Sequence, residues 1–314
     1  MCAGHNGQPE ARSPPPQLPE PRSLRLDGKA IIQYIDINPP DHSSQSPTIV
    51  LIHGSPGSFN DFRHLVPLLQ DACARIIAIT LPGFGGSEVI DPSSYYEHVV
   101  PLGGARLTLE ALRRLCGDEE SVFVVGHSFG GHTAINIVAM SEEKIQGQKH
   151  EEHSHDQHQS KLNVRGIVLL ASVGHRMPDS QWPIGSLVLG TLIRSELPVL
   201  APIASYMARL VYTKLLKFPE SAPTSHYASG MVRSAATDFE VVEDHLRRVA
   251  HIPAFVAWAK NDMHLSAESS EKLSRACHPG PRLAFERGGH NIQKTQAATL
   301  ATQISQWISA CCSS

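Results

Sequence analysis

The segment Gly126-His127-Ser128-Phe129-Gly130 restricts the fold of this chain more than any other part of its sequence. An apolar run precedes it and a helix-forming stretch follows it, so the segment predicts a strand, a sharp turn and a helix. Side chains two residues before and after the serine would collide in such a turn, and both of these positions are glycine. The N-terminus of the new helix would point at Ser128 and favour negative charge there. The segment therefore predicts an exposed, reactive serine at one edge of a sheet.

Short apolar runs and helix-like stretches alternate along the rest of the chain. The runs are typical of strands buried on both faces of a parallel sheet, and they occupy Thr48–Ile52, Arg75–Ile79, Ser121–Val125, Val164–Ala171, Ile252–Ala257 and Arg282–Phe285. Helices are expected at Asn60–Gln70, Leu107–Cys116, Thr133–Met140, Ala267–Cys277 and Thr295–Ser309. A hairpin over Leu24–Ile37 precedes the first run. The alternation predicts an α/β fold with a mostly parallel, doubly wound sheet.

The pattern changes at three places, and these changes predict the domain organisation. Residues 1–22 contain six prolines and little apolar material, so we expect a disordered arm. Residues 141–161 contain four histidines and one clear apolar residue, which predicts a flexible loop. Residues 175–250 are helical in pattern and rich in Leu, Val and Ala, so we expect an inserted helical cap. The remaining residues, 23–174 and 251–314, form the expected core.

The composition excludes several classes of protein. Hydrophobic residues make up 41% of the 314 residues, which is enough for a substantial core and excludes wholesale disorder. A net charge of −3 gives no general attraction to nucleic acid, so no nucleic-acid partner is expected. No run of about 18 uncharged apolar residues occurs, which argues against a membrane-spanning helix.

Smaller sequence features bear on location and cofactors. Six cysteines without a C-x-x-C pair, no secretory leader and no N-x-S/T sequon predict an intracellular, cytoplasmic protein. Cys311 and Cys312 leave a peripheral or lipid-anchored membrane association open. The histidines of residues 141–161 lack the fixed spacing of a coordination site, so neither a metal nor another cofactor is expected.

Five motifs in a fixed order resemble the α/β-hydrolase superfamily, in its capped branch with a serine nucleophile. The resemblance spans Leu24 to Ser309. Within the superfamily, a little-characterised eukaryotic group is similar to this chain in the run His53–Phe62 and the segment Gly288–Lys294. Each motif follows an expected strand. The motifs are His53-Gly54-Ser55-Pro56-Gly57, Leu81-Pro82-Gly83-Phe84-Gly85-Gly86-Ser87, the segment around Ser128, Ala259-Lys260-Asn261-Asp262 and Gly288-Gly289-His290.

The three side chains of a catalytic triad follow from these motifs. Ser128 is the expected nucleophile, and its weakly nucleophilic hydroxyl needs an adjacent base. His290 is the expected base and Asp262 the acid that orients it, in the chain order of this fold. The resemblance further implies an oxyanion hole made by the backbone N–H groups of Phe129 and Ser55.

Several alternatives compete with these assignments. Asp238 and Asp179 compete with Asp262, which we favour because it directly follows a strand end. His278 competes with His290 but precedes the last strand. His53 and His127 flank the expected site and are interpreted as packing or hydrogen-bonding residues.

The identity of the nucleophile narrows the chemistry. Haloalkane dehalogenases and epoxide hydrolases of this fold have aspartate at the turn, so Ser128 argues against both. We expect a serine hydrolase that cleaves a carboxylic ester or related acyl bond through an acyl-enzyme, with a small, lipophilic acyl substrate suggested by the apolar cap.

Two other functions remain open. The loop His53–Gly57 differs by one residue from the H-G-G-P-G of proline iminopeptidases, and Glu240, Glu243 and Asp244 supply acidic residues near the end of the cap. The chain is alternatively a non-catalytic binding protein on a hydrolase fold, since a fold alone does not guarantee activity.

Overall fold

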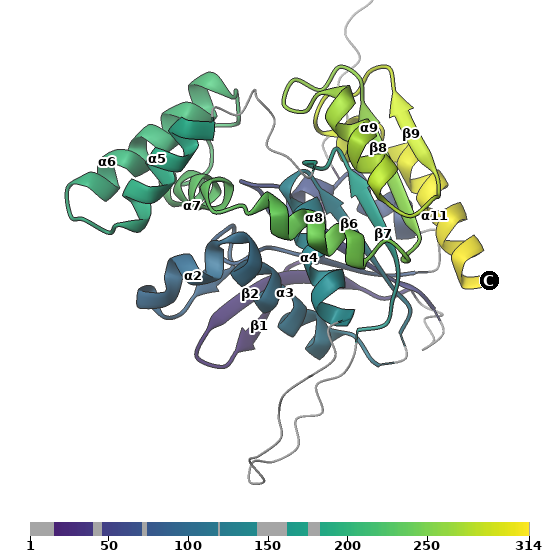
Figure 1. Ribbon diagram of the computed structural model, residues 1–314. Helices are drawn as coiled ribbons and strands as arrows, with labels where there is room; N and C mark the ends of the chain where they lie inside the picture. The colour runs from purple at the N-terminus through teal and green to yellow at the C-terminus, as the bar shows by residue number, and fades with distance from the viewer. Residues whose placement is uncertain are drawn as a thin grey trace, which may run out of the picture.

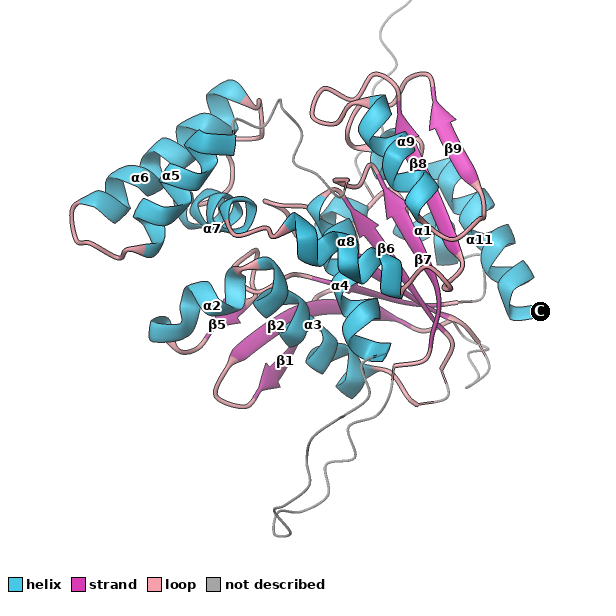
Figure 2. Ribbon diagram, in the orientation of Figure 1, coloured by secondary structure: helices cyan, strands magenta, loops and turns pink. Residues whose placement is uncertain are grey.

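The computed structural model describes residues 16–39, 46–70, 74–118, 120–142, 162–174 and 183–313. Residues 1–15 of the expected arm and residues 143–161 of the expected histidine-rich loop lie outside this range, as does Asp179. A single mixed sheet forms the centre of the described chain (Figures 1 and 2). Its strands are β1 (Arg22–Leu26), β2 (Ala30–Ile37), β3 (Thr48–Ile52), β4 (Arg75–Ile79), β5 (Glu88–Val89), β6 (Val122–His127), β7 (Val164–Leu170), β8 (Ala254–Ala259) and β9 (Arg282–Phe285).

The strand order is β1-β2-β4-β3-β6-β7-β8-β9, with β5 paired to β2. All neighbouring pairs from β4 to β9 are parallel, whereas β1, β2 and β5 pair antiparallel. The order reverses direction at β3, so the carboxyl ends of β3 and β6 adjoin the crevice in which ligands bind to such sheets. The prediction of an α/β fold with a mostly parallel sheet is confirmed.

Helices cover both faces of the sheet, and alternate strand residues point to opposite sides. Val50 and Ile52 of β3 pack with residues of the helices on one face, whereas Ile49 and Leu51 pack with those on the other. The two clusters explain why the central strands are continuously apolar. The helices are α1 (Val66–Leu69), α2 (Tyr95–Val99), α3 (Pro101–Leu115), α4 (Phe129–Glu142), α5 (Pro183–Arg194), α6 (Leu200–Leu210), α7 (Thr224–Ala235), α8 (Phe239–Arg248), α9 (Ala267–Ala276), α10 (Ile292–Thr295) and α11 (Ala297–Ser313), with 3-10 turns at Phe59–Phe62 and Pro92–Ser94 and a π-turn at Val211–Leu215.

Several observed bounds differ from the expected ones; α3, for example, begins at Pro101 instead of Leu107. Two differences have a clear physical meaning. The helix expected at Asn60–Gln70 is broken into a 3-10 turn and α1, because Pro67 has no N–H for a continuous helix and its ring would clash with the preceding turn. The first strand begins at Arg22 instead of Leu24, and Leu18, within the expected arm, packs against the core. Partial burial of the Leu18 side chain favours a path of the residues just before β1 along the protein surface.

The segment from α5 to α8, hereafter the helical insertion, lies between β7 and β8 (Figure 1). Its helices α5, α6 and α7 pack on one another around a small apolar cluster of their own. Two polar contacts join it to α4: Arg233 donates to Thr133 Oγ1, and His245 Nδ1 lies 2.8 Å from Asn136 Oδ1. No helix in the described part of the chain is long and apolar enough to cross a membrane.

Candidate active site

Ser128 occupies a strained turn between β6 and α4. Its φ angle is +54°, a left-handed conformation that is unusual for a residue with a side chain. The flanking glycines allow this turn: a Cβ at Gly126 would lie 2.4 Å from the Gly130 carbonyl oxygen, and a Cβ at Gly130 would lie 2.3 Å from the Ile52 carbonyl oxygen. The close approach of three backbone segments therefore holds the serine at the carboxyl end of β6.

The structure brings Ser128, His290 and Asp262 together. His290 Nε2 lies 2.9 Å from Ser128 Oγ, and His290 Nδ1 lies 2.8 Å from Asp262 Oδ2. Since an ionised carboxylate only accepts hydrogen bonds, Nδ1 carries the proton and Nε2 is left to accept one from the serine hydroxyl. The three residues follow β6, β8 and β9, so the sheet collects them at one edge although 162 residues separate Ser128 from His290.

Asp262 is held by the backbone on the side opposite His290. Its Oδ1 accepts hydrogen bonds from the N–H groups of His264 and Leu265, at 2.8 and 3.1 Å. Burial raises the pKa of this carboxyl. The hydrogen bond from His290 and these two N–H groups lower the pKa by more than burial raises it, so the net pKa lies below the ordinary value. Asp262 is therefore ionised at neutral pH and has one oxygen directed at the imidazole.

The loop that carries His290 is fixed by two residues that sequence reasoning did not assign to this task. Asn261 Oδ1 accepts from the N–H groups of Gly288 and Gly289, at 3.0 and 2.9 Å, and so ties this loop to the one that carries Asp262. His127 Nε2 donates to the His290 carbonyl oxygen at 3.0 Å. Asn261 stands beside Asp262 in the sequence, but no local pattern indicates that its partner lies 27 residues away.

Two buried histidines have structural roles, as their interpretation from sequence proposed. His53 Nδ1 donates to the Gly54 carbonyl oxygen at 2.5 Å, and its Nε2 accepts from Leu81 N–H at 2.9 Å. The second of these bonds joins the loop after β3 to the loop after β4. Burial lowers the pKa of both His53 and His127 to about 3, so both are neutral at physiological pH and provide no competing cation near the site.

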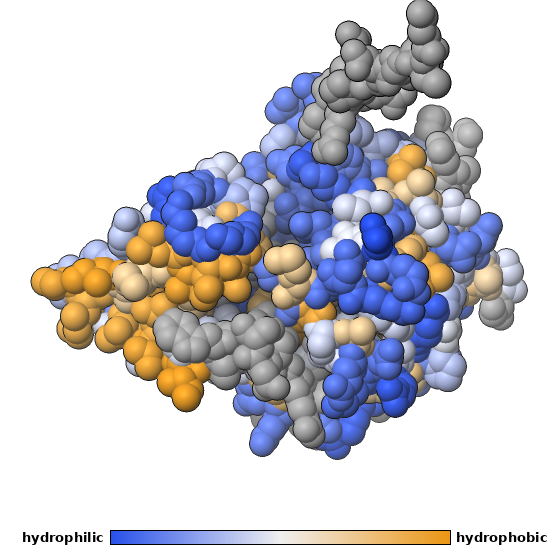
Figure 3. Space-filling view, turned by 90° about the horizontal axis from the view of Figure 1, so that it is seen from above, coloured by the Kyte–Doolittle hydropathy of each residue, from blue (hydrophilic) through white to orange (hydrophobic). Residues whose placement is uncertain are grey.

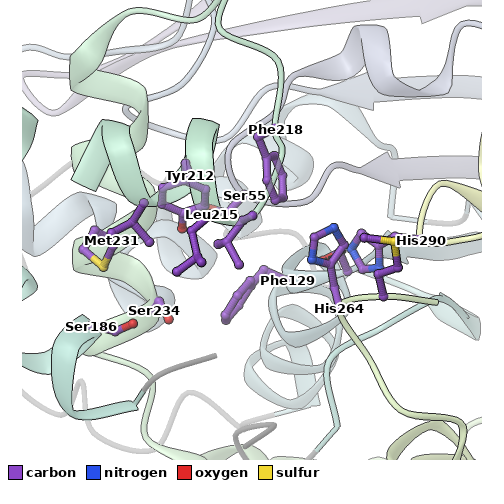
Figure 4. Close-up of a pocket in the computed structure, with 14 residues that line it drawn as sticks. Ser55, Phe129, Ser186, Tyr212, Leu215, Phe218, Met231, Ser234, His264 and His290 are labelled. Carbon is purple, nitrogen blue, oxygen red and sulfur yellow. Dashed lines mark hydrogen bonds between the residues drawn. The ribbon is translucent and has the colours of Figure 1, made fainter. Parts of the chain in front are cut away.

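A cavity of about 70 Å³ opens next to the Ser128 hydroxyl (Figure 4). His290 and His264 line one side of it, and Tyr212, Leu215 and Met231 from the helical insertion line the other. Its remaining lining residues are Ser55, Ser128, Phe129, Ser186, Val211, Leu216, Phe218, Ser234 and Met263. The cavity is thus mostly apolar and has a few polar groups near the serine, a composition typical of a small-molecule site.

His264 is a further residue that the sequence did not single out. Its ring lies 4.9 Å from the His290 ring and 5.4 Å from the Phe218 ring, measured between centroids. Burial, followed by the nearby His290, lowers the pKa of His264, so the neutral form is favoured at the cavity wall. Its position two residues after Asp262 is the signal that was available in the sequence.

Two of the competing residues, Asp238 and His278, lie elsewhere. Asp238 caps α8 by accepting from the N–H groups of Glu240 and Val241. His278 Nδ1 lies 2.8 Å from the carbonyl oxygen of its neighbour Pro279, in the turn before β9. Neither lies beside Ser128, whereas the two residues expected to form the oxyanion hole, Ser55 and Phe129, both line its cavity.

Comparisons with known proteins agree with the fold and place the chain among hydrolases. A family model described as "Alpha/beta hydrolase family" matches residues 49–303. Epoxide hydrolase B of Mycobacterium tuberculosis (strain H37Rv) is 31% identical over 126 residues, which cover 40% of this chain and 33% of that protein. The matched segment therefore spans about a third of this relative's length.

Solved structures match nearly the whole chain. A thermophilic esterase from Thermogutta terrifontis has a TM-score of 0.65 and 18% identity, covering 93% of this chain and 99% of its own. An esterase from Exiguobacterium antarcticum has a TM-score of 0.63 and 16% identity, covering 91% and 98%. At these identities the likeness extends to the fold alone.

Proposed function

The chain belongs to the alpha/beta hydrolase family, and we propose that within this family it is a serine hydrolase that cleaves a carboxylic ester or a related acyl bond. The observation that carries the proposal is the hydrogen-bonded series Ser128, His290 and Asp262, in which each bond is shorter than 3 Å. A serine hydroxyl becomes a nucleophile when a base takes its proton, and His290 Nε2 is placed to do so.

Acylation follows from this geometry. Ser128 Oγ attacks the carbonyl carbon of the substrate while its proton passes to His290 Nε2, and Asp262 stabilises the imidazolium that forms. Collapse of the tetrahedral intermediate breaks the bond to the leaving group, which takes the proton from His290. A water molecule then gives a proton to His290 Nε2 and attacks the acyl carbon, which releases the acid and restores Ser128. No metal or cofactor is needed for either half of the reaction.

Charge on the carbonyl oxygen requires its own stabilisation. Phe129 is the first residue of α4, and the leading N–H groups of a helix have no partner within it. We assign its N–H to the oxyanion hole, together with that of Ser55 from the loop after β3. Gly54 lies close to Ser128, since a Cβ added to this glycine would be 3.0 Å from the serine Cβ, so the loop is near enough to contribute. The hole would act on charge that develops in the transition state.

The cavity favours an uncharged, short acyl group. Among the described residues that line it there is no Asp or Glu, so it offers no carboxylate to the amino group of an aminopeptidase substrate. The acidic residue Asp244 pairs with Arg247 and Arg248 instead. A serine at position 128 also gives no support for the epoxide opening that the name of the mycobacterial relative implies. A volume of about 70 Å³ holds only a short chain, because an apolar cavity of about 150 Å³ holds a benzene.

The helical insertion has the position of a cap in this proposal. Tyr212, Leu215 and Met231 from it line the cavity on the side opposite His290 and His264 (Figure 4). We propose that these side chains exclude water from the acyl group and limit its length. In this proposal residues 175–250 are the cap, and residues 23–174 and 251–314 are the core.

Phe218 lines both the cavity beside Ser128 and a second cavity of about 320 Å³. Truncating it in Phe218→Ala should join the two spaces. We expect the wild type to prefer acetyl and butyryl esters, and the variant to gain about tenfold or more in kcat/KM for octanoyl relative to acetyl esters. A series of p-nitrophenyl esters measures this ratio.

The control for Phe218 is Tyr206→Ala, which removes another aromatic ring from the insertion, one that lines neither cavity. Its acyl preference should equal that of the wild type. An unchanged preference in Phe218→Ala would show that Phe218 does not limit the acyl chain.

Labelling with a fluorophosphonate tests the proposed function directly. The reagent phosphorylates a serine only when a base activates it, so we expect one adduct per chain, located on Ser128 by digestion and mass spectrometry. Protein unfolded in urea is the control and should not react, because the three side chains are then apart. Absence of an adduct on the folded protein would contradict the proposal and favour a non-catalytic binding protein.

A further inference from the structure

Helices α5 and α6 present apolar side chains to solvent. Ile184, Leu187 and Val188 of α5 are 76%, 55% and 51% exposed, and Val199, before α6, is 68% exposed. Figure 3 shows these elements as a broad hydrophobic region at one end of the molecule. The apolar face, as we name it, consists of Ile184, Leu187, Val188, Leu197, Val199, Leu200, Ile203, Tyr206 and Met207.

The spacing of these residues shows that whole helix faces are exposed, not single side chains. In α6 the exposed residues Leu200, Ile203 and Met207 follow the helical repeat, while Ala204 and Ala208 point into the insertion and are buried. The usual arrangement, with large apolar residues inward and polar residues outward, is therefore reversed. Patches of this kind on soluble proteins mark surfaces that contact a partner or a membrane.

The charge of the same segment differs from that of the whole chain. Residues 183–220 contain four basic residues, Arg194, Arg209, Lys214 and Lys217, and two acidic ones, whereas the complete sequence has a net charge of −3. Arg194, Lys214 and Lys217 are exposed, and Lys214 forms an ion pair with Glu220. The apolar face thus lies in a locally basic part of a weakly acidic protein, and this combination fits an apolar surface with anionic groups at its boundary.

Two further exposed apolar side chains, outside the apolar face, stand at the candidate active site. Leu215 is 65% exposed and Met263 is 79% exposed, and both also line the cavity beside Ser128. Leu215 belongs to the insertion and Met263 to the loop after β8, so the exposed apolar side chains stand on both sides of the opening. A lipophilic molecule leaving a lipid phase would meet apolar contacts up to the cavity.

We propose that the apolar face docks the protein on a lipid surface that contains anionic headgroups. A second copy of the chain is a poorer occupant, because a two-fold contact would place the same basic residues of both copies together. A lipid surface instead accepts the apolar side chains between its acyl chains and pairs the basic groups with lipid phosphates and carboxylates. Docking stands without the proposed function, and only the delivery of substrate to Ser128 depends on it.

Flotation of the full chain with vesicles tests the docking. We use vesicles of phosphatidylcholine alone and of phosphatidylcholine mixed with phosphatidylserine, and we expect binding to the mixed vesicles that weakens at high salt. The double variant Val199→Glu/Ile203→Glu should bind at least about tenfold more weakly, since two exposed apolar side chains that would enter the lipid are replaced by charges. Leu68→Glu is the matched control, because Leu68 is 40% exposed on α1 of the core, and it should bind as the wild type does.

Further measurements separate docking from misfolding and from catalysis. Circular dichroism and the hydrolysis of a water-soluble ester should be unaltered in the double variant, since neither residue lines the cavity. Ser128→Ala should bind vesicles as tightly as the wild type, so a failure of the proposed chemistry leaves the docking test intact. In Tyr206→Trp we expect the added indole fluorescence to shift to the blue on mixed vesicles, because the ring enters the lipid.

Three outcomes would overturn the proposal. In the first, the wild type does not bind the mixed vesicles. In the second, the double variant binds them as well as Leu68→Glu does. In the third, sedimentation velocity shows that the wild type is a dimer and the double variant a monomer, while neither protein binds vesicles. The last result would assign the apolar face to self-association.

Discussion

Replacing Ser128 with alanine will reduce kcat/KM for a soluble p-nitrophenyl ester by about 10⁶-fold, the size of the loss found when the nucleophile alone is removed from a Ser-His-Asp hydrolase. The physical reason is that the variant has no atom that can form the acyl-enzyme, while the oxyanion donors and the cavity remain. The KM should change little, because the hydroxyl contributes its main interaction in the transition state.

The matched control for this prediction is Ser141→Ala. Ser141 is a buried serine of α4, the helix that follows Ser128, but its hydroxyl donates to the Val138 carbonyl oxygen and it does not line the cavity. Its loss should leave hydrolysis within a few-fold of the wild type. If Ser128→Ala keeps more than about a tenth of the activity, the hydrolysis occurs elsewhere and Ser128 is not the nucleophile.

The serine turn was predictable from sequence because the glycines that allow it flank the serine at fixed positions in the chain. The collisions that exclude side chains at positions 126 and 130 involve residues within the turn or on the neighbouring strand β3. The order of Ser128, Asp262 and His290 along the chain also carries information, since each residue follows a strand and parallel strands end at a common edge. The same logic accounts for the strands β3, β4 and β9, whose observed bounds match the expected ones.

The remaining parts of the site depend on tertiary contacts that no local pattern reveals. Asn261 accepts a hydrogen bond from the backbone of Gly288, and Phe218 lines two cavities. The repeat of apolar residues in α6 indicates an amphipathic helix, but the sequence alone does not show whether its apolar face is buried or exposed. Only the packing of α5, α6 and α7 decides that the alanines are inside and the larger residues outside.

Asp262→Asn should reduce kcat/KM by about 10⁴-fold near neutral pH, as the equivalent change does in a Ser-His-Asp enzyme. The structure gives the reason. The N–H groups of His264 and Leu265 require an acceptor at the Oδ1 position, so the carbonyl oxygen of the new amide will take that place. Its NH₂ group will then face His290 Nδ1 and donate to it, which moves the imidazole proton to Nε2. A protonated Nε2 has no lone pair for the Ser128 proton.

Asp238→Asn is the control that distinguishes this effect from the loss of any loop carboxylate. Asp238 competed with Asp262 in the sequence, but in the structure it caps α8, and asparagine is an equally good capping residue. We therefore expect its activity to stay within a few-fold of the wild type. The rate of fluorophosphonate labelling should fall in Asp262→Asn together with kcat/KM, because both need the same proton transfer. A normal labelling rate would mean that Asp262 does not set the tautomer of His290, and the assignment of the acid would be wrong.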